Sequence, residues 1–190
     1  MSDDPLHRLE ARLAELAERQ RRLEQRFARL EDGGDARLRT GSHRERVIHF
    51  LDQFRAGEAL GEASLGAWIA VCTDRALRGG LRTVQAREAS HARLLAERIK
   101  ELGGAPSFEI ADATWTQVMD ASSSTERSDA QKVAAFVARF PDAARALAPI
   151  HAVADHLDDD PETRALLLSI ARDERETLEL FYEAAQRLAP

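Results

Sequence analysis

The chain has 190 residues, of which 44% are hydrophobic and 32% charged, so it is expected to fold into one domain with an appendage. A net charge of −6 argues against nucleic acid as a partner, and no apolar run approaches the roughly 20 residues of a membrane helix. The polar N-terminal sequence predicts no signal peptide, and the single cysteine, Cys72, fits a reducing compartment. Together these features predict a cytoplasmic protein without a membrane or nucleic-acid partner.

Residues 5–31 carry a heptad pattern, in which core positions are spaced 3-4-3-4-3-4-3 and Gln20 is the one polar member. This pattern predicts a coiled-coil helix through which the chain forms a homo-oligomer over residues 6–30, without deciding between dimer and trimer. A helix that folds back on its own bundle is the alternative. Residues 32–43 follow as a linker that includes two adjacent glycines. The core positions are Leu6, Leu9, Leu13, Leu16, Gln20, Leu23, Phe27 and Leu30.

Residues 44–190 are predicted to be all-α and to form a four-helix bundle, because Ala, Leu, Arg and Glu dominate and no strand pattern occurs. The first helix begins at a capping box of Ser42 and Glu45. The second ends at a glycine pair followed by Pro106. The turn between them lies at residues 72–74 or at a second glycine pair, residues 79–80.

The second and third helices are separated by a long connection, residues 104–127, with a short helix expected around Trp115. The third helix follows a capping box at Ser128 and is interrupted at Pro141. The fourth begins at Pro161. A connection of this length is what a bundle needs when its second and third helices run parallel.

The apolar stripes of these helices contain ionisable residues where leucine or isoleucine would be expected. Charged side chains rarely face a bundle core without a partner, because burying an unpaired carboxylate costs several kcal/mol. A bound cation is the simple way to compensate them. The candidate metal ligands are Glu58, Glu62, Glu88, His91 and Glu174.

The heights of these residues along the bundle favour the earlier turn. With a turn at residues 72–74, Glu58 lies about 15 residues before it and Glu88 about 15 after, so the two are level. With the turn at residues 79–80 they would be separated by roughly 18 Å. His91 lies one helical turn from Glu88 on the same face, and Glu174 is also near mid-bundle.

The run Arg55-Ala56-Gly57-Glu58, then Glu88-x-x-His91 and then Leu102-Gly103-Gly104-x-Pro106, resembles the first half of a ferritin-like di-iron protein. The glutamate spacing is similar to that of the demethoxyubiquinone hydroxylases and the rubrerythrins, and Arg172-Asp173-Glu174 resembles the start of their second Glu-x-x-His. The resemblance covers residues 44–188. It implies that Glu58, Glu88, His91 and Glu174 are ligands of one or two iron ions, and that the chemistry involves oxygen or peroxide.

The chain departs from that family pattern in its second half. Thr177 occupies the position of the second histidine, and Arg145 lies near the height where the third helix should supply a glutamate. Glu62 could replace that carboxylate, although a glutamate there is also common on a helix surface. Four carboxylates and one imidazole suit iron or manganese, and zinc would also fit.

A metal-free bundle that acts as a structural or protein-interaction module is the alternative function. In that case Glu88 and His91 form a hydrogen-bonded pair, and Glu174 pairs with Arg145 across the third and fourth helices.

Overall fold

The computed structural model describes residues 42–189, and every regular element in this range is an α-helix. The compact unit considered below begins at Val47. The predicted coiled coil at residues 5–31 and nearly all of the linker at 32–43 lie outside the described residues, so self-association through residues 6–30 stays a prediction. None of the described helices is both long and apolar enough to span a membrane.

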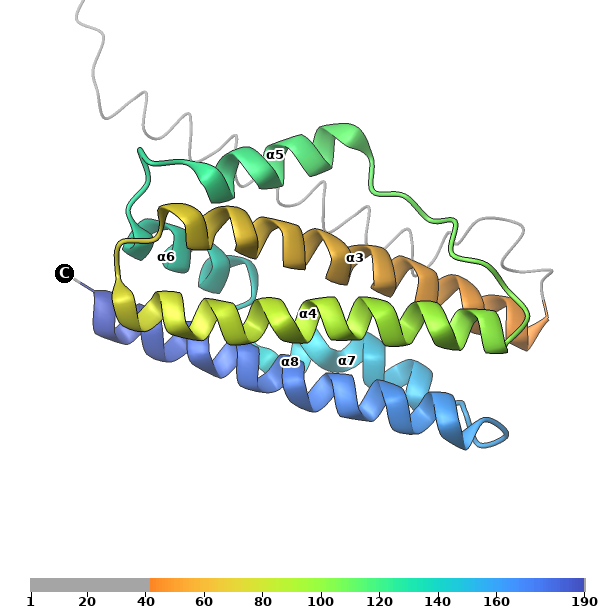
Figure 1. Ribbon diagram of the computed structural model, residues 1–190. Coiled ribbons are helices and arrows are strands. Elements are labelled where there is room, and N and C mark those ends of the chain that lie inside the picture. Colours follow the sequence, from red (N-terminus) through yellow and green to blue (C-terminus); the bar gives the residue numbers. More distant parts are fainter. Residues whose placement is uncertain (1–41, 190) are drawn as a thin grey trace, which may run out of the picture. The chain divides into compact units, whose positions relative to one another are not determined.

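The long helices lie side by side (Figure 1). Helices α3 and α4 are antiparallel, and the connection after α4 carries α5 back along α3 to the end of the bundle at which α4 begins. Helices α6 and α7 then run in the direction of α4, and α8 runs against them. The elements are α3 (His43–Val71), α4 (Arg75–Glu101), α5 (Asp112–Ser123), α6 (Asp129–Arg139), α7 (Ala143–Ala154) and α8 (Pro161–Leu188).

The turn between α3 and α4 lies at residues 72–74. This position was predicted because it places the candidate ligands at equal heights along the bundle. Asp74 caps α4 by accepting a hydrogen bond of 2.7 Å from the backbone N–H of Leu77. Both glycines of the 79–80 pair lie inside α4. A Cβ at Gly80 would come within 2.6 Å of Leu180 Cδ1, so this glycine lies where α8 packs closely against α4.

The other predicted helix ends are also confirmed. Gly103 follows α4 with a φ of 75°, a conformation that glycine adopts without strain. Ser128 and Gln131 form the predicted capping box of α6. The third helix is broken at residues 140–142, next to Pro141, into α6 and α7, and Pro161 is at the start of α8.

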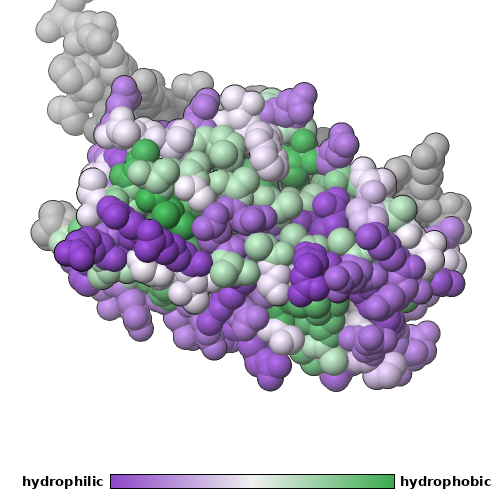
Figure 2. All heavy atoms as spheres, viewed as in Figure 1, coloured by the Kyte–Doolittle hydropathy of each residue, from purple (hydrophilic) through white to green (hydrophobic). Residues whose placement is uncertain are grey.

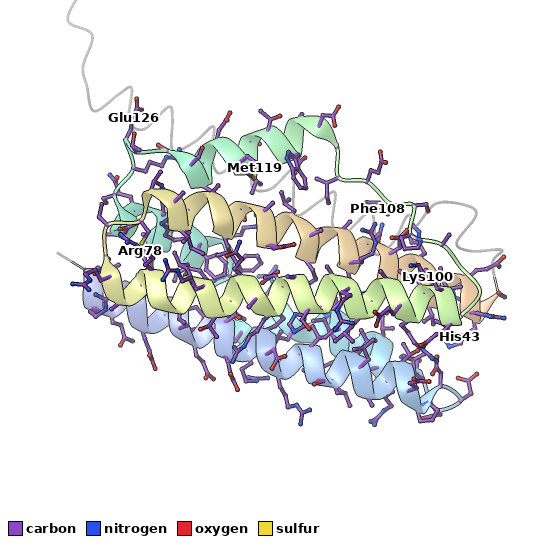
Figure 3. The ribbon with its side chains drawn as sticks, in the orientation of Figure 1. His43, Arg78, Lys100, Phe108, Met119 and Glu126 are labelled. Carbon is purple, nitrogen blue, oxygen red and sulfur yellow. The ribbon has the colours of Figure 1, made fainter. Side chains whose placement is uncertain are left out.

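Two buried aspartates that the sequence analysis did not single out fasten the loops to the bundle. Asp52 on α3 accepts the backbone N–H groups of Ser107 at 2.8 Å and Phe108 at 2.7 Å, which fixes the connection where it passes α3 (Figure 3). Asp129 at the start of α6 accepts backbone hydrogen bonds of 2.8 Å from Thr73 and 2.9 Å from Asp74.

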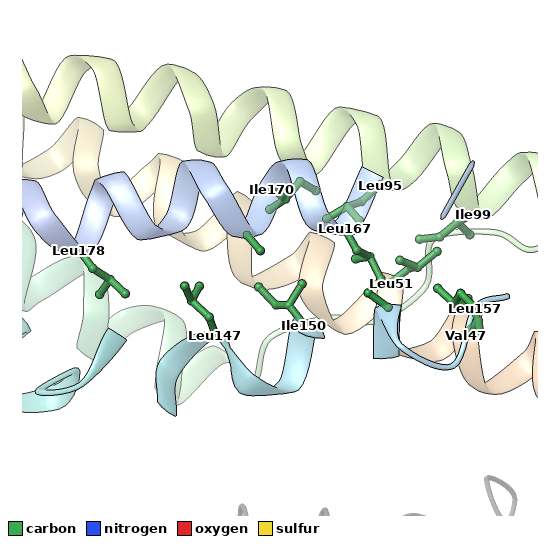
Figure 4. Close-up of a cluster of buried hydrophobic side chains, with 12 residues drawn as sticks. Val47, Leu51, Leu95, Ile99, Leu147, Ile150, Leu157, Leu167, Ile170 and Leu178 are labelled. Carbon is green, nitrogen blue, oxygen red and sulfur yellow. The ribbon is translucent and has the colours of Figure 1, made fainter. Parts of the chain in front are cut away.

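The hydrophobic core consists of two clusters. The first includes Leu51, Leu95 and Leu167 (Figure 4), and the second includes Leu65 and Val84. Along α3, the buried residues of the first cluster end at Leu51 and those of the second begin at Leu65. Along α4, the buried residues of the second cluster end at Val84 and those of the first begin at Leu95. The candidate ligands of these two helices lie between the two clusters, so a polar layer separates two apolar regions of one bundle.

Helix α5 contributes little to this core, since none of its residues is buried. Trp115, at 39% exposure, is the only large hydrophobic side chain classed as exposed among residues 42–189. The face seen in Figure 2 mixes hydrophobic groups with many hydrophilic residues.

Candidate metal centre

Three of the candidate ligands converge from three different helices. Glu58 of α3, His91 of α4 and Glu174 of α8 each offer a ligand atom, and these atoms all lie within 4.8 Å of one another. Glu58 is 4% exposed and His91 3% exposed, while the side chain of Glu174 is 20% exposed. This is the only such group of His, Cys, Asp and Glu side chains in the described part of the chain.

The local sequence explains why these side chains meet. Glu58 lies 13 residues before the end of α3 at Val71, and Glu88 lies 13 residues after the start of α4 at Arg75, so the two have equal heights. His91 is one turn further along α4 on the same face. Because α8 is antiparallel to α4 and packed against it, Glu174 comes to the same level from the other side.

His91 is held by carboxylates at both ring nitrogens. Its Nδ1 lies 3.0 Å from Glu58 Oε2 and 3.5 Å from Glu174 Oε1, and its Nε2 lies 3.0 Å from Asp173 Oδ2. Ionised carboxylates only accept hydrogen bonds, so both nitrogens donate in this arrangement and the ring is an imidazolium. Burial opposes that charge, but contacts with Glu174, Glu58 and Asp173 outweigh it and raise the pKa of His91 to about 10.

Glu88 lies beside Glu58 without belonging to the converging group. Burial, together with the negative charges of Glu58 and Glu174, raises the pKa of Glu88 to about 10. Its protonated carboxyl group donates a hydrogen bond to Glu58. Burial also raises the pKa of Glu58, although the contact with His91 opposes this. Without a metal ion, a proton on Glu88 and a second proton on His91 therefore reduce the negative charge of the layer but do not cancel it.

Glu174 retains an acceptor that this proton arrangement does not satisfy. Its Oε1 is buried without a hydrogen-bond partner, and so is Oγ1 of Thr177 one turn later on α8. These are the only such side-chain atoms among residues 42–189. Nδ1 of His91 lies 3.5 Å from Glu174 Oε1 but only 3.0 Å from Glu58 Oε2. A buried carboxylate oxygen that lacks a donor and lies beside an imidazole is a suitable ligand for a cation.

Two other residues of the sequence analysis lie away from this group. Glu62 is half-buried on α3, and its carboxylate does not belong to the converging set. Arg145 is exposed on α7, and the ion pair of Glu174 is with His91, so the hypothesis of an Arg145–Glu174 pair is wrong. Asp173 was missed as a site residue, and the only signal for it in the sequence is its position next to Glu174.

A groove between α4 and α8 leads from the surface to the site. It has a volume of about 550 Å³, and its walls include Arg87, Ser90, Ile170 and Asp173, with His91 also in contact with it. The groove therefore reaches the Nε2 side of His91, where Asp173 is bound, rather than the Nδ1 side that faces the two glutamates.

Comparisons of this chain with protein-family models, with curated proteins and with solved structures find no match.

Proposed function

We propose that the bundle binds one divalent metal ion between Glu58, His91 and Glu174, with Glu88 beside it as a further oxygen ligand. The observation that carries this proposal is the buried Oε1 of Glu174, which has no hydrogen-bond donor and lies close to a histidine nitrogen and a second carboxylate from two other helices. The function proposed is metal binding, and the activities to assay are iron handling and iron-dependent oxidation.

The distances around His91 fit one small cation. Ligand atoms that surround one ion at about 2.1 Å lie about 3 to 3.5 Å from one another. His91 Nδ1 lies 3.0 Å from Glu58 Oε2 and 3.5 Å from Glu174 Oε1. An ion could therefore replace the hydrogen on Nδ1 with small movements of the side chains.

The donor set supports one ion and a limited choice of metals. Glu62 lies outside the group and Thr177 provides no imidazole, so residues 42–189 provide no second ligand group at this level. Carboxylate oxygens with a single imidazole suit iron or manganese, and zinc is also compatible.

The ferritin-like architecture that the sequence resembles is part of the same proposal. It is supported by the chain path, in which the long connection lets α6 and α7 run parallel to α4 (Figure 1). In that family, bound iron supplies chemistry with oxygen or peroxide.

The residues of this chain would prepare the site for the ion. Asp173 accepts the Nε2–H of His91, which directs the Nδ1 lone pair toward Glu58 and Glu174 once the Nδ1 proton has left. The protons on Glu88 and His91 must leave before these side chains act as ligands.

The test is direct titration of chelator-treated protein with Fe²⁺ under anaerobic conditions, with Mn²⁺ and with Zn²⁺, by calorimetry. We expect one ion per chain, and we expect Glu174→Gln to lose most of the affinity. Glu179→Gln is the matched control, because Glu179 is exposed on the same helix. An Asp173→Asn variant should bind about 10- to 100-fold more weakly. Absence of binding at millimolar metal, or equal affinity of wild type and Glu174→Gln, would overturn the proposal.

A metal-free structural module is the second candidate, and the engagement of both His91 nitrogens by carboxylates at 3.0 Å favours it. Such a cluster already supplies hydrogen-bond donors to Glu58 and Asp173 without a metal ion. The two candidates differ in the effect of metal on stability, because an ion that binds only the folded state raises its melting temperature. The metal-free module predicts no such rise with any of the three metals.

A further inference from the structure

Helix α3 carries three glycines that differ in what a side chain would meet. A Cβ added at Gly57 would meet nothing within 4 Å, and one at Gly66 would lie 2.8 Å from the amide nitrogen of Gln85. At Gly61 the three nearest atoms all belong to Glu88, with Cδ at 3.0 Å and the carboxyl Oε2 closer still. The Glu88 carboxyl group therefore occupies the space that a side chain at Gly61 would fill.

The contact with Gly61 places the Glu88 carboxyl group close to Glu58 on α3. Glu58 and Gly61 are three residues apart, so they lie on one face of the helix about one turn from each other. A carboxyl group that packs against the backbone at Gly61 is therefore next to the carboxyl group of Glu58. Atoms of other residues lie further from a Cβ at Gly61 than these atoms of Glu88 do. An alanine at this position would therefore conflict with Glu88 before any other residue.

We propose that Gly61 is a positioning residue of the metal centre: the missing side chain lets the Glu88 carboxyl group lie beside Glu58, where it serves as a further oxygen ligand. Its role in metal binding rests on the function proposed above, but the contact itself does not require a metal ion. An alanine at Gly61 turns the flexible Glu88 side chain away from α3 while the helix is retained, because alanine forms helix better than glycine.

The first test measures Mn²⁺ affinity by calorimetry in three single variants. We expect Gly61→Ala to weaken binding about ten-fold or more, the size of effect that follows when a ligand loses its orientation. The matched controls on the same helix are Gly57→Ala, which meets no neighbour, and Gly66→Ala, which displaces Gln85 instead. Both controls should stay within about two-fold of wild type. Equal weakening by all three variants, or no weakening by Gly61→Ala, would overturn the positioning role.

The second test uses metal-free protein and a double-mutant cycle on the melting temperature. With Glu88 present, Gly61→Ala should raise the melting temperature less than Gly57→Ala does. In a Glu88→Ala background, the two alanine substitutions should give equal rises, because the conflicting carboxyl group is gone. If Gly61→Ala has the same effect in both backgrounds, the inference fails whatever the metal result. If the cycle shows coupling but wild-type protein binds no metal, only the proposed metal function fails.

Discussion

Replacement of Glu88 by glutamine tests the electrostatic cost of the polar layer. In the metal-free protein, the Glu88 carboxyl group is protonated and donates to Glu58. A glutamine amide has nearly the same shape and also donates, so the contact with Glu58 can be kept. The substitution removes only the need to take up a proton when the chain folds. We therefore expect Glu88→Gln to stabilise the metal-free protein at neutral pH.

The size of this effect follows from the pKa of Glu88, which rises from 4.5 to about 10 on folding. A group whose pKa is raised contributes stability below its unfolded pKa and loses it as the pH rises toward its folded pKa. This loss of stability begins near the unfolded pKa of 4.5, so at pH 7 it extends over about two and a half pH units. Each unit corresponds to about 1.4 kcal/mol. Glu88→Gln should therefore add at most about 3.5 kcal/mol at pH 7 and almost nothing at pH 4.

Urea unfolding of chelator-treated protein at several pH values measures this difference. Glu97→Gln, an exposed substitution on the same helix, is the control and should change stability little at any pH. Metal should oppose the effect, because an ion at 100 times its dissociation constant stabilises the wild type by about 2.7 kcal/mol. A Glu88→Gln protein that is less stable than wild type at pH 7 without metal would refute the reasoning.

Three further substitutions test the fold around the site. Asp129→Asn should cost about 2 to 3 kcal/mol at neutral pH, because the carboxylate accepts backbone hydrogen bonds from the α3–α4 turn. Burial alone would raise the pKa of Asp129, but hydrogen bonds hold it well below its usual range. The contribution of Asp129 to folding stability is therefore present above pH 3.8 and is lost as the pH falls further. Urea unfolding should show that the stability difference between wild type and Asp129→Asn becomes smaller in acid. Gly79→Ala, which meets no neighbour, should raise stability by about 1 kcal/mol. Gly80→Ala should not, because its Cβ meets Leu180, and thermal unfolding of the pair checks the packing of α4 against α8.

The helix ends could be predicted from sequence because their signals are local. Glycine after α4, the Ser128 capping box and Pro161 each act within a few residues of the end they define. The buried partners of Asp52 and Asp129 could not, because each aspartate binds a loop about 55 residues away in sequence. Nothing in the adjacent residues distinguishes these carboxylates from ordinary surface ones.

The candidate site also has one part that could be predicted from the sequence and one part that could not. The level of Glu58, Glu88 and His91 depends on one short turn, so counting residues along two helices was enough to bring them together. The site residues on α7 and α8 depend on how each of these helices is rotated about its own axis, which a count of residues does not give. Arg145 follows the break at residues 140–142, and its side chain is exposed. Asp173 reaches His91 only because of the way α8 faces α4.

The polar layer is hard to explain by packing alone. Apolar residues of similar volume at Glu58, Glu88 and Glu174 would be neutral or stabilising, since replacing buried ionic groups in this way often adds 1 to 4 kcal/mol. Gly61 also lowers stability relative to alanine by about 1 kcal/mol in a helix interior. All four of these unfavourable choices lie at one level of the bundle, whereas the core on both sides is well packed with aliphatic and aromatic residues. Concentration of such choices in one place is typical of a functional site, and the proposed cation would offset the carboxylates that His91 leaves uncompensated there.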